Sequence, residues 1–127
     1  MRNKRIRHGC FSIEENEQVT KVVAMGGSYQ GKLSTAEILD VKSMQWKDLP
    51  DLPFAVDFNK GVESVIGPYL GFSVAGRSQM TNIEKRVIGL RKNQNGNNYY
   101  WEQANILTTG RMLPTVVNAP ISMVPSC

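Results

Sequence analysis

The chain has 127 residues, of which 41% are hydrophobic and 20% charged, and this ordinary globular composition suits about one domain. Apolar residues occur along the whole sequence, which argues against disorder, and no apolar stretch approaches the ~20 residues of a membrane span. The formal net charge is +4, with four cations among the first seven residues. We interpret the basic segment 1–8 as a solvated leader and not as a nucleic-acid-binding arm, because no aromatic residues alternate with its cations.

The two cysteines, Cys10 and Cys127, stand near opposite ends of the sequence and suggest no disulfide framework. The basic segment is not followed by the apolar run of a secretory signal. We therefore predict a cytoplasmic protein in a reducing compartment.

Four short strands are predicted in the first part of the chain. Residues 9–13 lead into an acidic turn, and the apolar segment 22–25 is typical of a strand covered on both faces. Residues 37–41 are rich in apolar side chains, and a polar turn separates them from a strand with Trp46. This order indicates an antiparallel, all-β unit.

The second part of the chain repeats that order. Predicted strands at residues 61–66, 70–75 and 85–90 precede a strand with Trp101, and the second of them alternates apolar and small residues. Asn95-Gly96 is a strong hairpin signal, because a type I′ turn needs positive φ at both central residues. The sequence thus predicts a second four-stranded unit.

The repeat period is about 50 residues. Gly26 and Gly76 are 50 residues apart, whereas Trp46 and Trp101 are 55 apart, and the extra residues fall in the asparagine-rich turn before Trp101. Four-stranded units with this period are typical of β-propeller blades. We therefore divide the chain into two blades, residues 1–54 and 55–109, and the opening strand of a third, residues 110–127.

This pattern resembles the kelch repeat, in which a strand ends in a glycine pair and a later strand carries tryptophan. The first unit matches at Gly26, Gly27 and Trp46, and the second at Gly76 and Trp101, with Arg77 in place of the second glycine. The resemblance implies a partial kelch-type β-propeller: two four-stranded antiparallel blades plus the first strand of a third. It also implies that the tryptophans fill the space between neighbouring blades, since indole buries a large area.

Protein recognition without catalysis is the function that the resemblance implies. Kelch propellers commonly present substrates to cullin-type ubiquitin ligases or bind actin, and we expect no cofactor, metal or catalytic residues here. The partner would contact loops at one end of the blades, where aromatic and arginine side chains are typical of binding hot spots. The predicted contact residues are Tyr29, Gln30, Lys32, Arg77, Gln79 and Met80.

Two alternatives remain open. Residues 26–33 nearly fit the phosphate-binding pattern G-x-x-x-x-G-K-[ST], with Leu33 in the hydroxyl position, and residues 34–37 could cap the helix that this motif requires. In addition, two blades are too few to close a propeller, so the chain is expected to be a fragment of a longer propeller or to assemble with copies of itself as a structural half-propeller.

Overall fold

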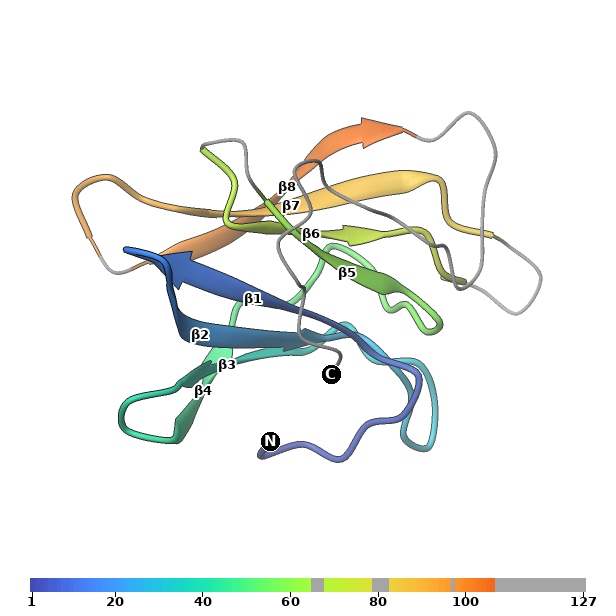
Figure 1. Ribbon diagram of the computed structural model, residues 1–127. Coiled ribbons are helices and arrows are strands. Elements are labelled where there is room, and N and C mark those ends of the chain that lie inside the picture. The colour runs from blue at the N-terminus through green and yellow to red at the C-terminus, as the bar shows by residue number, and fades with distance from the viewer. Residues whose placement is uncertain (65–67, 79–82, 97, 107–127) are drawn as a thin grey trace.

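The computed structural model describes residues 1–64, 68–78, 83–96 and 98–106, and these residues form eight strands and no helix. The strands make two four-stranded antiparallel sheets, each in chain order, which confirms the predicted all-β class (Figure 1). The first sheet contains β1 (Gly9–Glu15), β2 (Gln18–Met25), β3 (Ala36–Asp40) and β4 (Gln45–Leu49). The second contains β5 (Lys60–Glu63), β6 (Gly71–Val74), β7 (Arg86–Lys92) and β8 (Tyr99–Ile106). The predicted opening strand of a third blade, residues 110–127, lies outside the described residues.

The hairpins of the first sheet follow from local turn chemistry. Asn16 and Glu17, between β1 and β2, have φ values of 52° and 62°. Two consecutive residues with positive φ give a turn whose twist matches the right-handed twist of the flanking strands. Between β3 and β4, the Asp40 carboxylate accepts a hydrogen bond from the Ser43 amide at 2.9 Å. The described residues contain no helix that is long and apolar enough to cross a membrane.

The two sheets share one hydrophobic core. Strand pairing places Phe11, Val23 and Ile38 in one row on the face of the first sheet that meets the second. Ile88 and Leu90 of β7 join the same buried cluster from the other side. Trp101 of β8 packs against this cluster, and its indole Nε1 donates to the Pro50 carbonyl oxygen at 2.8 Å. Trp101 thus lies between the sheets.

Trp46 of β4 has a different environment. It pairs with Leu39 of β3, and this register places both side chains on the face of the first sheet that points away from the second. Leu39 and Trp46 are only half-buried. The same face of the second sheet, with Leu90 and Trp101, is the one packed on the first sheet. The face with Ile38 in the first sheet therefore packs against the face of the second sheet that is equivalent to the Leu39 and Trp46 face. We call this arrangement, in which opposite faces of two equivalent sheets meet, back-to-front stacking.

Close packing between the sheets depends on two glycines that the sequence analysis did not single out. A Cβ atom on Gly61 of β5 would meet the backbone of Cys10 in β1. A Cβ atom on Gly71 of β6 would meet the ring of Phe11. Glycine is needed where another backbone or ring approaches a strand this closely. β1 and β5 consequently lie next to each other (Figure 1).

The glycine register of the two units differs from the expected one. Gly26 and Gly27 follow β2 with φ values of 65° and 90°, and Ala75 and Gly76 follow β6 with φ values of 56° and 97°. In both sheets the next residue forms an isolated β-bridge. Gly76 therefore corresponds to Gly27, and the expectation that Arg77 replaces the second glycine is wrong. Ala75 replaces the first glycine, in a left-handed conformation that a non-glycine residue seldom adopts.

The basic N-terminal segment is not simply a solvated leader, and that interpretation is wrong at Arg5. The Arg5 side chain is fully buried and pairs at 2.8 Å with the equally buried Glu37 carboxylate of β3. Its guanidinium also donates to the carbonyl oxygens of Gly26 and Thr35, at 2.8 and 2.9 Å. The segment thus covers part of the outer face of the first sheet and ties it to the loop that follows β2.

Candidate functional site

The described parts of the loops predicted to form the partner surface lie at one end of both sheets, together with the N-terminal segment. We call this region the loop end; it comprises residues 4–8, 26–35, 54–59, 75–78 and 83–84. Backbone hydrogen bonds connect them across the sheets. The Gly27 amide donates to the Val56 carbonyl oxygen at 2.7 Å, and the Val56 amide donates to Leu33 at 3.0 Å. Asp57 and Arg77 exchange backbone hydrogen bonds of 2.8 and 3.2 Å. The linker between the two sheets is therefore held between their glycine loops.

Tyr29, Gln30 and Lys32 belong to the loop after β2. Tyr29 is 49% exposed, Gln30 is exposed with φ of 55°, and Lys32 is half-buried. The Lys4 ammonium lies 5.9 Å from the centre of the Tyr29 ring, within cation–π range. This loop offers solvent an aromatic ring beside a cation.

Arg77 lies on the neighbouring loop and is half-buried. Its guanidinium contacts the Asp57 carboxylate at 3.4 Å and lies 5.3 Å from the centre of the Phe58 ring. The exposed Arg7 guanidinium lies 4.7 Å from the same ring. Arg7 and Phe58 both adopt positive φ, and the Phe58 amide donates to the Arg7 carbonyl oxygen at 2.9 Å. Two guanidinium groups thus lie within cation–π range of one aromatic ring.

Arg7 and Phe58 were not predicted as site residues. Arg7 belongs to the segment interpreted as a leader, and Phe58, in the linker between the sheets, is not among the six predicted contact residues. Unusual backbone conformation is concentrated here, as it often is at functional sites. The two remaining predicted contacts, Gln79 and Met80, lie outside the described residues.

At the loop end, acidic side chains are buried and basic side chains are exposed. The carboxylates of Glu37 and Glu84 are buried and each faces an arginine. Burial, and secondarily the nearby Arg5 cation, lowers the pKa of His8, so this imidazole is neutral near pH 7. Arg7 and Lys4, by contrast, are exposed cations. The surface of the loop end is accordingly basic above a layer of buried acids.

Exposed apolar side chains accompany these cations. Ile6 is 59% exposed and Ile83 is 44% exposed, and both take part in the isolated β-bridges that follow the two strands β2 and β6. Together with Tyr29, they give the loop end an amphipathic surface. Mixed aromatic, aliphatic and arginine composition of this kind is characteristic of protein-binding surfaces.

The geometry of residues 26–33 does not suit phosphate binding. The amides of Gly27, Ser28 and Tyr29 donate to protein carbonyl oxygens at 2.7, 2.8 and 2.9 Å, so they are not available to cradle phosphate. The motif also requires a helix after Lys32, whereas the next element is the strand β3. The expectation that residues 34–37 cap a helix is wrong.

The loop end can therefore contact a macromolecule through side chains on three rigidly connected loops. Trp46 and Trp101 lie in the sheets, and the glycine pairs lie beneath the surface of the loops. Comparison of the chain with known proteins found no protein-family model and no curated protein that matches it.

Proposed function

We propose that the chain is part of a kelch-type β-propeller and binds another protein through the loop end, without catalysis. The observation that carries the proposal is that the guanidinium groups of Arg7 and Arg77 both lie within cation–π range of the Phe58 ring, at 4.7 and 5.3 Å from its centre. Arginine and aromatic side chains held in place before binding lose little conformational freedom when a partner arrives. Their position at a rigid end of two sheets is what a recognition surface requires.

The repeat supports the kelch assignment. Both sheets have four antiparallel strands in chain order, and both β2 and β6 are followed by two left-handed residues. The sheets also stack back to front, which is how successive blades surround an axis. The resemblance to kelch propellers favours a substrate of a cullin-type ubiquitin ligase, or actin, as the partner in the cytoplasm.

The test is affinity capture from cell extract with the whole chain and two variants. Arg7→Ala/Arg77→Ala removes both cations from the Phe58 ring, and Lys42→Ala/Lys60→Ala removes the same charge from exposed positions outside the cluster. We expect proteins that the wild type and the Lys variant capture equally to be depleted about tenfold by the Arg variant, a loss of roughly 1.4 kcal/mol. Equal capture by all three would contradict the proposal, provided that their β-sheet circular dichroism is the same.

A structural role as a self-assembling half-propeller is the second candidate. It is favoured by the partly exposed Leu39 and Trp46 on the outer face of the first sheet, which correspond to Leu90 and Trp101 in the packed interface. A further copy could contact this face as the first sheet contacts the second. The oligomeric state, discussed below, distinguishes the two candidates.

A further inference from the structure

A pocket of about 250 Å³ lies between the two sheets at the end opposite the loop end. Strand register places it there: Lys21, Asp40 and Gln45 share the row farthest from the glycine loops, and Lys92 pairs with Tyr99 at the corresponding end of the second sheet. Pockets for drug-sized ligands measure roughly 300–1,000 Å³, so this one suits a smaller molecule.

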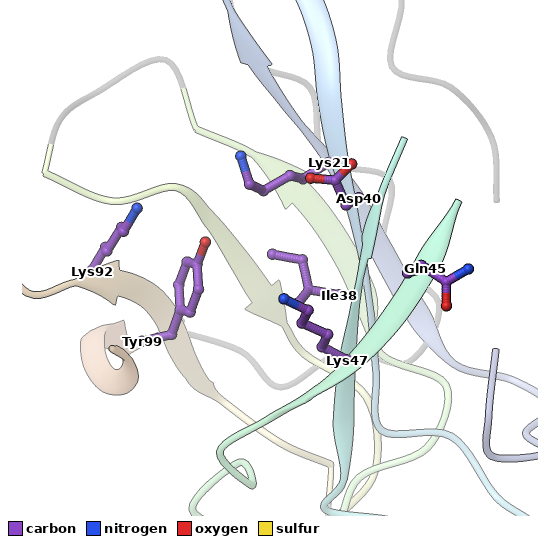
Figure 2. A pocket seen from close by; sticks show the side chains of 7 residues that line it. All are labelled: Lys21, Ile38, Asp40, Gln45, Lys47, Lys92 and Tyr99. Atoms are coloured by element: carbon purple, nitrogen blue, oxygen red, sulfur yellow. The ribbon is translucent and has the colours of Figure 1, made fainter. Parts of the chain in front are cut away.

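The pocket has an apolar floor and a cationic rim. Ile38 of β3 is buried in the shared core, and the half-buried Tyr99 of β8 packs against that core. Figure 2 shows the side chains of Lys21, Lys47 and Lys92 directed toward the same space around Ile38 and Tyr99. Three cations from three different strands therefore surround one apolar patch.

Two of these cations lack a carboxylate partner. The Lys21 ammonium lies 3.5 Å from Glu15, and it also lies near Asp40, whose pKa is lowered mainly by a hydrogen bond from the Ser43 amide. Neither Lys47 nor Lys92 makes an ion pair within the part of the chain that the structure describes. Two uncompensated positive charges match the two negative charges of a phosphomonoester near pH 7.

We propose that this pocket binds a small organic phosphate, with its apolar body against Ile38 and Tyr99 and its phosphate oxygens hydrogen-bonded to Lys47 and Lys92. Lysine ammonium groups are point-charge donors that bind phosphate without a fixed orientation. The Tyr99 ring, with the Lys92 ammonium 5.7 Å from its centre, provides a flat wall for a planar or short aliphatic group. The pocket is separate from the loop end. The small molecule would therefore bind at a different place from the proposed protein partner.

The experiment is a titration of the ¹⁵N-labelled chain with phenyl phosphate, inorganic phosphate and phenol at low salt, followed by amide shifts in β4 and β8. We expect saturable binding of phenyl phosphate, about tenfold weaker binding of inorganic phosphate, and no saturation with phenol. Lys47→Gln/Lys92→Gln should weaken phenyl phosphate binding about tenfold or more. The charge-matched control, Lys42→Gln/Lys60→Gln, should bind as the wild type does.

Three outcomes would overturn the proposal. One is the absence of saturable binding of phenyl phosphate. Another is equal weakening by the two double variants, which would indicate a response to net charge alone. The last is equal affinity for inorganic and phenyl phosphate, which would deny a role to Tyr99 and Ile38. The dispersed amide spectrum of each variant verifies that it is folded, and Arg7→Ala/Arg77→Ala should leave the affinity unchanged, so this test and that of the loop end succeed or fail separately.

Discussion

The pair of Arg5 and Glu37 shows how a single buried contact attaches the N-terminal segment to the first sheet. Both side chains are fully buried, and Arg5 adds hydrogen bonds to two carbonyl oxygens. Glu37 also accepts hydrogen bonds from the amides of Arg2 and Asn3 at 2.7 and 3.3 Å. A buried ion pair contributes little net stability relative to apolar residues. Removal of one partner, however, leaves the other charge buried without a counter-charge, which is strongly destabilising.

We expect Arg5→Met to lower the free energy of unfolding by about 3–5 kcal/mol, because it leaves the Glu37 carboxylate buried without its counter-charge. Arg2→Met is the control, since Arg2 and Asp48 form an exposed pair with side-chain exposures of 59% and 61%. That change should cost at most about 1 kcal/mol. Urea denaturation followed by circular dichroism measures both, and equal midpoints for the two variants would show that the buried pair has no special role.

The left-handed residues after β6 lead to a second prediction. Ala75→Gly should raise the free energy of unfolding by up to about 1 kcal/mol, because glycine avoids the cost of φ near 56°. Gly76→Ala should lower it by about 1–3 kcal/mol, since its Cβ would lie 2.7 Å from the Asp57 carbonyl oxygen. Gly96→Ala, whose Cβ would have its nearest neighbour at 3.9 Å, is the control for thermal denaturation. Opposite signs at positions 75 and 76 are the decisive result.

At the scale of elements, β7 begins at a clamp between Glu84 and Arg86. Glu84 accepts hydrogen bonds from the Arg86 amide at 2.9 Å and from its guanidinium at 2.6 and 2.9 Å. The guanidinium also stacks over Phe54, 3.9 Å from the ring centre. These contacts, chiefly the side-chain hydrogen bonds from Arg86, lower the pKa of Glu84 to about 2. The clamp fixes β7 to the linker between the sheets.

The clamp predicts a specific acid sensitivity. A carboxylate whose pKa is lower in the folded than in the unfolded chain stabilises the fold above about pH 4.5, and this contribution is lost as the pH falls toward 2. Because Arg86 is 43% exposed, we expect only about 1–2 kcal/mol from this source. Glu84→Gln should remove that part of the pH dependence, which urea denaturation at pH 6, 4.5 and 3 would measure. Identical profiles for variant and wild type would exclude the clamp as the cause.

The strands were largely predictable because period-2 alternation and apolar runs are local signals. The type I′ turn predicted at Asn95-Gly96 is wrong, since neither residue has positive φ. Residues 70–75 and 85–90 overlap β6 and β7 closely. The register of the glycine pairs was not predictable, because residue type reveals which positions tolerate positive φ but not which adopt it. Ala75 precedes Gly76, whose carbonyl oxygen accepts from the Glu84 amide as that of Gly27 accepts from the Leu33 amide, and no composition rule indicates this correspondence.

At the scale of the whole molecule, the proposed binding surface depends on contacts between residues that are remote in sequence. Arg7 and Phe58 are far apart in the chain, yet a backbone hydrogen bond of 2.9 Å joins them. Tyr29 and Arg77 were predicted as contacts because of their residue type and their position in loops, and both lie at the loop end. It could not place Arg7, because a basic segment has no local pattern that distinguishes a solvated leader from a docked one. The inter-sheet pocket was missed because its lining residues come from different strands of both sheets and have no pattern in the sequence.

The back-to-front stacking of the sheets predicts an assembly. If the outer face of the first sheet receives another copy, light scattering after size-exclusion chromatography should show a discrete oligomer. Trp46→Lys should reduce it to a monomer, because the side chain lies on that face and is only half-buried in the single chain. Tyr29→Lys, at the exposed loop end, is the control and should leave the oligomer intact. A wild-type monomer would favour the interpretation of a propeller fragment.

Burial of Arg5 against Glu37 also imposes an order of events on synthesis at the ribosome. The two residues are 32 positions apart, so Arg5 emerges well before its partner. At about 5–20 residues per second, the interval is roughly 2–6 seconds. Throughout that time Arg5 lacks the Glu37 carboxylate that pairs with it in the fold. The segment around Arg5 can take its folded position only after β3 has left the exit tunnel, so this segment is fixed later than its place in the sequence suggests.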